Sequence, residues 1–106
     1  MPKFLCQATY SAKGIEGIVH DSASGRRADV QATVKALGGR VESFYYAFGE
    51  DDLVMIVDLP NAKTAAALSL RSEGTGAVRV RTTPLLTVEE MDQALEVELD
   101  YRAPGE

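Results

Sequence analysis

Cysteine and histidine are almost absent from this sequence, and each scarcity excludes a class of site. The only cysteine is Cys6, so the chain can form no internal disulfide and suits a reducing compartment. The only histidine is His20, so no cluster of histidines can hold a metal ion. No cofactor-binding motif occurs either. We therefore expect neither a metal site nor a cofactor.

Clustered positive charge and long apolar runs are missing too. The net charge is −5, whereas proteins that bind nucleic acid need clustered Lys and Arg to displace counterions from phosphates. The same lack of clustered positive charge disfavours binding to membrane surfaces. No apolar run approaches the ~20 residues of a membrane-spanning helix. The amino terminus lacks the pattern of a signal peptide. We expect a cytoplasmic protein that binds neither nucleic acid nor membrane.

The composition that remains is that of an ordinary globular domain. The 106 residues are 45% hydrophobic and 25% charged, which is enough to form one core. No linker, low-complexity segment or repeat divides the chain. We therefore expect a single domain over residues 1–106.

The segment from Val41 to Asn61 predicts two strands joined by a short acidic turn. Side chains alternate along the first strand, so one predicted face holds Val41, Ser43, Tyr45 and Ala47, and the other Glu42, Phe44, Tyr46 and Phe48. The second strand, Leu53–Leu59, is apolar on both faces apart from Asp58. Such a strand needs cover on both sides. We expect helices on one face of the sheet and a second copy of the chain on the other.

The flanking segments predict the rest of the sheet and its helices. Strand patterns occur over Lys3–Tyr10 and Ala77–Pro84, and helical patterns over Ile15–Val19, from near Ser24 to Leu37, and over Ala62–Ser72. The resulting order, β-α-β-β-α-β, predicts an α+β, ferredoxin-like antiparallel sheet with helices on one face and the first and third strands in the centre. The open face of this sheet then predicts a homodimer.

An additional helix is predicted at the C-terminal end. Thr87 and Glu90 have the spacing of a capping box, with Leu86 and Met91 placed as a hydrophobic staple. Apolar residues then recur on one side of the helix, at Val88, Met91, Leu95 and Leu99. Residues 100–106 form a polar tail.

Four segments, PKFLCQATY, LGGRVESFYYAFGEDD, IVDLP and VRVRTTPLLT, are typical of a known family. In them the chain resembles the GYD-domain proteins along nearly its whole length. The resemblance implies a ferredoxin-like fold related to dimeric α/β-barrel proteins, and it implies no particular activity. The family's Gly-Tyr-Asp signature lies in the hairpin turn, which here reads Gly49-Glu50-Asp51-Asp52, so Asp51 stands in the place of the tyrosine.

One functional hypothesis is a small cofactor-free enzyme, by analogy with the monooxygenases and isomerases of the dimeric α/β-barrel class. His20, with Tyr10 or Tyr46, would then supply acid–base catalysis. A histidine at a helix end or on the surface explains His20 more simply. An exposed His20 would count against the enzyme, and a buried one facing an aromatic cavity would favour it.

The alternative, which we favour, is a homodimeric module that binds a small apolar or anionic ligand or has a regulatory role. Five aromatic residues could line its pocket, although core packing explains them as well: Tyr10, Phe44, Tyr45, Tyr46 and Phe48. Arginines could hold an anion, although a solvated surface explains them too: Arg26, Arg27 and Arg40, or Arg79 with Arg81. The acidic run from Glu50 to Asp52 fits turn formation better than cation binding, and Cys6 fits an inert buried thiol.

Overall fold

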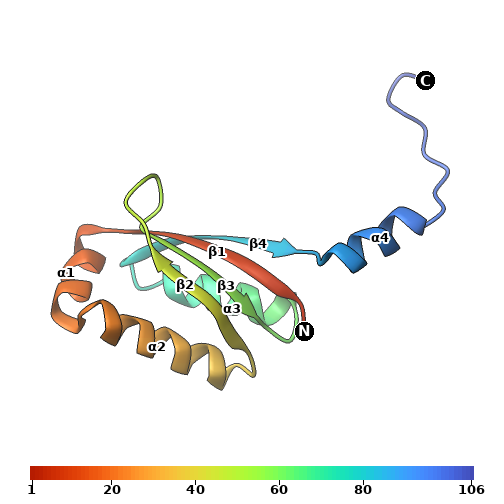
Figure 1. The fold of residues 1–106 in the computed structure, drawn as a ribbon. Helices are drawn as coiled ribbons and strands as arrows, with labels where there is room; N and C mark the ends of the chain where they lie inside the picture. Colours follow the sequence, from red (N-terminus) through yellow and green to blue (C-terminus); the bar gives the residue numbers. More distant parts are fainter.

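A computed structural model, which describes residues 1–106, contains one open sheet of four antiparallel strands with helices on one face (Figure 1). The strands are β1 (Lys3–Tyr10), β2 (Arg40–Tyr46), β3 (Leu53–Asp58) and β4 (Val78–Leu85), in the order β2-β3-β1-β4. β1 and β3 are central, as the order of the elements predicted. The α+β, ferredoxin-like arrangement predicted from the sequence is confirmed.

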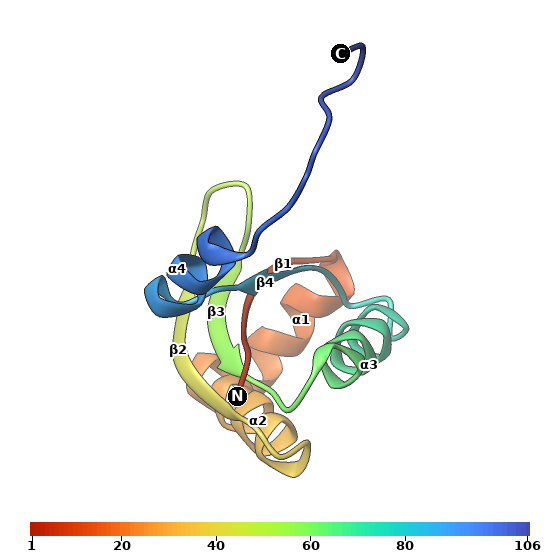
Figure 2. The same ribbon diagram turned by 90° about the vertical axis from the view of Figure 1, so that its right-hand side faces the viewer.

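Three helices cover one face of the sheet, α1 (Ala12–Asp21), α2 (Ala23–Ala36) and α3 (Ala62–Glu73) (Figure 2). Each begins at a polar cap, because the side-chain oxygens of Ser11, Ser22 and Asn61 accept hydrogen bonds from the first turn. The sequence predicted a break of four residues between α1 and α2. The structure breaks the helix at Ser22 alone, which takes a positive φ of 71°. No helix is both long and apolar enough to span a membrane.

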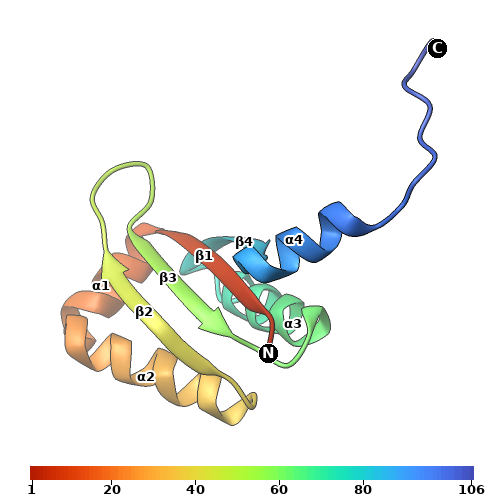
Figure 3. The same cartoon turned by 45° about the vertical axis from the view of Figure 1, so that its right-hand side comes forward.

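The core lies between the sheet and these helices. Alternate residues of the two central strands are buried there, with Phe4 and Cys6 of β1 beside Met55 and Val57 of β3. The helices contribute Val34 and Ala65, and the segment after β3 contributes Leu59. The opposite face of β1, β3 and β2 has no element in front of it (Figure 3).

A β-bulge in β2 changes one of the predicted faces. The pairing with β3 shifts between Val41 and Ser43, so that Glu42 is an extra residue in the strand. Val41 therefore packs against the core with Phe44, whereas we had predicted it on the face of Ser43 and Tyr45. That prediction was wrong for Val41, because strict alternation does not survive a bulge. Beyond the bulge, Phe44 and Tyr46 share a face as predicted.

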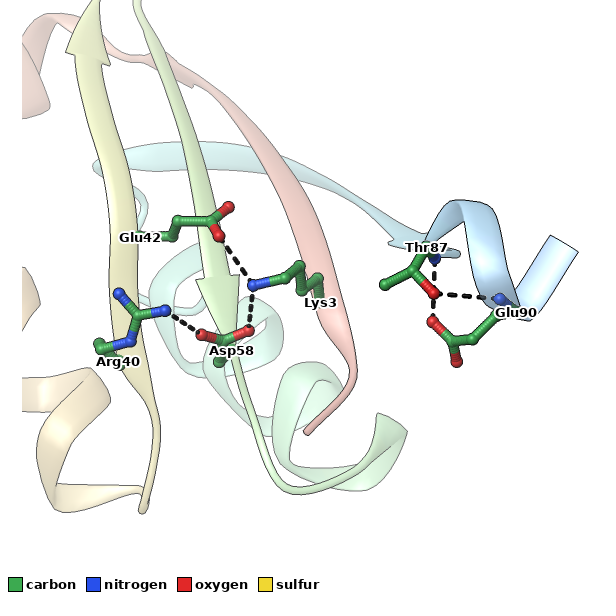
Figure 4. Close-up of polar contacts among 6 residues, drawn as sticks. All are labelled: Lys3, Arg40, Glu42, Asp58, Thr87 and Glu90. Atoms are coloured by element: carbon green, nitrogen blue, oxygen red, sulfur yellow. Dashed lines mark hydrogen bonds and ion pairs between the residues drawn. The ribbon is translucent and has the colours of Figure 1, made fainter.

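The C-terminal helix α4 (Val88–Glu96) projects beyond the end of β4, away from the other helices (Figure 1). Its capping box is confirmed: the Thr87 hydroxyl accepts from the Glu90 amide at 3.1 Å, and the Glu90 carboxylate accepts from the Thr87 amide at 2.9 Å (Figure 4). The radius of gyration is 16.8 Å, against about 13 Å for a compact chain of ~100 residues. The helix and the tail after it thus form an arm, residues 86–106, outside the body of the protein.

This C-terminal arm is both acidic and apolar. Residues 86–106 contain seven of the sixteen acidic residues and one of the eleven basic ones, which leaves nine acidic and ten basic residues in the body. The apolar side chains of Val88, Met91 and Leu95 are exposed along α4. The helix ends before Leu99, one turn earlier than its apolar pattern predicted. The arm therefore carries a net charge of −6 and the body one of +1, and the apolar side of α4 has no partner within the chain.

Candidate functional site

A cavity of about 120 Å³ between the sheet and helices α2 and α3 is the clearest candidate site. The cavity exists because α2 packs along β2 while α3 packs along β4, so the central strands lie between the two helices. Nine of its fourteen lining residues are hydrophobic, including Ala8, Met55 and Leu68. Ligand sites are commonly of this kind, mostly apolar with a few polar groups that orient the ligand.

A wider hollow of about 280 Å³ adjoins the cavity, and its eleven lining residues include four hydrophobic ones, two glycines and five polar ones, among them Lys13 and Asp21 of α1. Four residues line both spaces, Tyr10, Arg26, Ser72 and Val78. Tyr10 and Arg26 therefore lie at the boundary between the cavity and this outer hollow. A ligand with one apolar end and one polar end could lie across this boundary.

Tyr10 is fixed at this boundary by the hairpin turn. Its backbone amide donates to the Asp52 carboxylate at 2.8 Å, and the Asp52 amide in turn donates to the Ala8 carbonyl. Burial raises the pKa of the Tyr10 phenol, and the Arg26 guanidinium acts in the opposite direction. The phenol stays protonated at neutral pH, so it can donate a hydrogen bond.

The structure places His20 apart from the other two acid–base candidates, whereas Tyr46 lies close enough to Tyr10 for Tyr10 to influence its pKa. The His20 side chain is 88% exposed, forms a hydrogen bond with Asp21, and lines neither the cavity nor the outer hollow. Tyr46 lies in a separate shallow hollow, where its hydroxyl donates to the Ala23 carbonyl at 2.9 Å. Only Tyr10 lies in the cavity. The exposure of His20 is the arrangement that we expected to count against an enzyme.

The aromatic residues likewise separate into groups. Phe44 and Tyr46 stack edge to face with ring centroids 5.3 Å apart and line the shallow hollow. Tyr45 and Phe48 are exposed outside both spaces. Cys6 lines the cavity as a buried thiol whose pKa is raised by that burial, so it is poorly suited to act as a nucleophile.

The arginines differ in the partners that they have. Arg40 pairs with Asp58, and Arg81 pairs with Asp51, which also accepts from the Gln7 amide. Arg27 is exposed beside the shallow hollow. Arg26 is half-buried, lines the cavity and takes part in none of the five ion pairs of the chain. The sequence predicted Arg26 as one of several possible anion ligands. In the structure, Arg26 is the one that is half-buried at the cavity without an ion pair.

Sequence reasoning missed a second polar cluster, at one end of the uncovered sheet face. The Asp58 carboxylate accepts from Lys3 and from Arg40, each at 2.8 Å, and Lys3 also donates to Glu42 at 2.8 Å (Figure 4). Hydrogen bonding from Lys3 is the main reason why the pKa of Asp58 is lowered, and Arg40 adds to it. The signal was present in the sequence, because Asp58 is the only charged residue in an apolar strand and therefore needs a partner.

The lowered pKa of Asp58 predicts a dependence of stability on pH. A carboxylate whose pKa is lower in the folded state stabilises the fold above its unfolded pKa of about 3.9, and this contribution is lost as the pH falls through the folded value. We expect Asp58→Asn to lower the melting temperature by a constant amount above about pH 5, with the difference from wild type shrinking below about pH 4.

Thermal unfolding followed by circular dichroism from pH 3 to pH 7, in roughly half-unit steps across the titration range of a carboxylate, measures this difference. Asp29→Asn is the matched control, because Asp29 is exposed on α2 and makes no ion pair. A difference for Asp58→Asn that stays constant down to the lowest pH would show that its ion pairs contribute nothing to folding.

Comparison with known proteins identifies a family for most of the chain. The family model of the GYD domain matches residues 4–95, which include all of the sheet except Lys3, all the residues that line the cavity, and most of α4. No curated protein and no solved structure matches the chain.

Proposed function

The chain belongs to the GYD-domain family, and we propose that it is a homodimeric module that binds a small ligand in the cavity between the sheet and helices α2 and α3. The observation that carries the proposal is the cavity itself, which is mainly apolar and has Tyr10 and Arg26 at its opening to the outer hollow. A core packed for stability alone leaves few voids larger than a water molecule. A cavity of this size over the two central strands is better explained by a ligand.

The uncovered face of the sheet supports the dimer. Leu5, Val54 and Ile56 lie next to one another at its centre, because Leu5 pairs with Ile56 across β1 and β3. Tyr45 of β2 is 71% exposed on the same face. An apolar sheet face of this kind is usually covered by a second layer, and a twofold axis lets two copies cover each other. The exposed apolar side of α4 would gain cover in the same assembly.

The polar groups on this face lie at its ends. Lys3, Arg40, Glu42 and Asp58 pair with one another at one end, and Gln7, Asp51 and Arg81 at the other. These charges are paired within one chain, and the unpaired Arg79 lies exposed on the edge strand β4 beside Thr9, away from the apolar centre. A second copy can therefore approach that centre without burying an isolated charge. We place the module in the cytoplasm, since its single thiol is buried and suits a reducing compartment.

Native mass spectrometry of gently purified protein tests the proposed function, with the same sample denatured for comparison. We expect the mass of two chains together with a reproducible additional mass of the size of a small metabolite. The bound molecule should be released on denaturation. A folded monomer at micromolar concentration would contradict the dimer. A dimer without additional mass whose cavity also binds no small apolar probe would contradict the ligand.

A further inference from the structure

We propose that the ligand is a small monocarboxylate with an apolar body about the size of a benzene ring, held by Arg26 and Tyr10 at the opening of the cavity. The inference rests on the proposed function, that the cavity binds a small ligand, and goes on to assign the chemistry of that ligand. The apolar body would lie over Ala8, Met55 and Leu68, and the carboxylate would face the outer hollow.

The size of the apolar body follows from the volume of the cavity. An apolar cavity of roughly 150 Å³ in another protein admits benzene, so about 120 Å³ leaves room for one small ring or a short branched chain and little more. A long acyl chain or a nucleotide base with its sugar would not fit. The opening toward the hollow of about 280 Å³ gives a polar head group space outside the apolar part.

The charge of the ligand follows from the position of Arg26. A guanidinium is always protonated and presents a planar fork of donors that matches a carboxylate. Arg26 of α2 is half-buried between the cavity and the hollow and has no carboxylate partner in the chain. Arg40 and Arg81 on the sheet are both paired. Arg27 and Arg79 are also without an ion pair, but both are exposed, so Arg26 alone of the five candidate arginines is unpaired and half-buried.

Tyr10 provides the second donor, from β1, and lines both the cavity and the hollow as Arg26 does. It lies at the end of β1, its backbone is held by Asp52, and its phenol lies close enough to Arg26 for the guanidinium to influence its pKa. The phenol remains a donor at neutral pH, because burial raises that pKa. An arginine and a phenol that converge at the edge of an apolar cavity favour one anionic head group on an apolar body over a neutral or cationic ligand.

The test is a titration with sodium benzoate, followed by amide chemical shifts of the ¹⁵N-labelled full-length chain. We expect a dissociation constant on the order of 1 mM for so small a probe, with the largest shifts at cavity residues such as Leu53, Met55 and Leu68. Benzamide has the same ring without the charge. It should bind about tenfold more weakly, since a charge-assisted hydrogen bond contributes roughly a factor of ten or more.

Three arginine variants distinguish the role of Arg26 from that of general surface charge. Arg26→Gln should weaken benzoate binding by about tenfold or more and leave benzamide binding nearly unchanged. Arg27→Gln is the matched control, because Arg27 is the adjacent residue of α2, is exposed and does not line the cavity. It should change the benzoate affinity by less than about twofold. Arg26→Lys, which keeps the charge and loses the fork, should fall between wild type and Arg26→Gln.

The possible outcomes separate a failure of the monocarboxylate assignment from a failure of the proposed ligand-binding function. Equal weakening by Arg26→Gln and Arg27→Gln, or equal affinity of wild type for benzoate and benzamide, would overturn the assignment of the carboxylate to Arg26. If benzamide binds in the cavity and benzoate does not, the small-ligand function stands and the anionic class is wrong. If neither probe shifts the cavity residues and the purified dimer carries no additional mass, both proposals fail.

Discussion

The variants Gly14→Ala and Gly17→Ala should change stability in opposite directions, although both lie in α1 and add a single methyl group. A Cβ at Gly14 would lie 2.1 Å from the carbonyl oxygen of Ala77 and 3.0 Å from the Tyr10 ring. That carbonyl cannot move freely, because it accepts the hydrogen bond of the Ser11 amide at 2.9 Å. We expect Gly14→Ala to lower the free energy of unfolding by about 2–3 kcal/mol through this overlap.

Gly17→Ala is the control for this prediction. A Cβ at Gly17 would meet no atom within 4 Å, so the methyl group causes no clash. Alanine in a helix interior is more stable than glycine by roughly 0.5–1 kcal/mol, because the unfolded chain has less backbone freedom to lose. Urea unfolding followed by circular dichroism, at one protein concentration for all variants, measures both changes. Two destabilised variants, or two stabilised ones, would show that α1 is not packed against the start of β4 as the structure has it.

The close approach at Gly14 also affects the candidate site. Gly14 lines the outer hollow beside Tyr10, so the docking of α1 helps to form the wall of that hollow. No pattern in the sequence singles out Gly14, because a glycine in a short amphipathic helix has several explanations. Its contact with Ala77 joins segments more than sixty residues apart, and such contacts cannot be inferred from local pattern.

Sequence reasoning succeeded where the physical cause is local. The capping box at Thr87 and Glu90 depends on residues three positions apart, and it occurs where it was expected. The central positions of β1 and β3 followed from the β-α-β-β-α-β order of the elements, and the apolar character of these strands agrees with them.

It failed where one extra residue or a distant partner decides the outcome. The bulge at Glu42 places the Val41 side chain on the opposite face of the sheet from the predicted one. No pattern within β2 marks the position of the bulge. The pairing of Asp58 with Lys3 depends on strands that are distant in sequence and adjacent in the sheet. Arg26 was one candidate among five arginines, and only the packing of α2 against the sheet places it at the cavity while Arg27 points elsewhere.

The variant Ile56→Glu should convert the proposed dimer into a folded monomer. Ile56 lies at the centre of the uncovered face, with Leu5 on one side and Ser43 on the other. In a single chain a glutamate at this position can reach water, so the fold tolerates it. In a dimer of facing sheets the carboxylate would be buried without a partner, which costs several kcal/mol. We expect dimer affinity to fall by a factor of about 100 or more.

Sedimentation velocity at micromolar concentration measures this change, with circular dichroism to show that the variant remains folded. Ala28→Glu adds the same charge at an exposed position of α2, away from the open face and from the cavity, and should remain dimeric. If Ile56→Glu and Ala28→Glu are both dimeric, the two copies do not meet through the open sheet face. The exposed apolar side of α4 is then the next surface to substitute. If Ile56→Glu is monomeric but still binds benzoate with wild-type affinity, the cavity belongs to one chain and the dimer only protects the sheet.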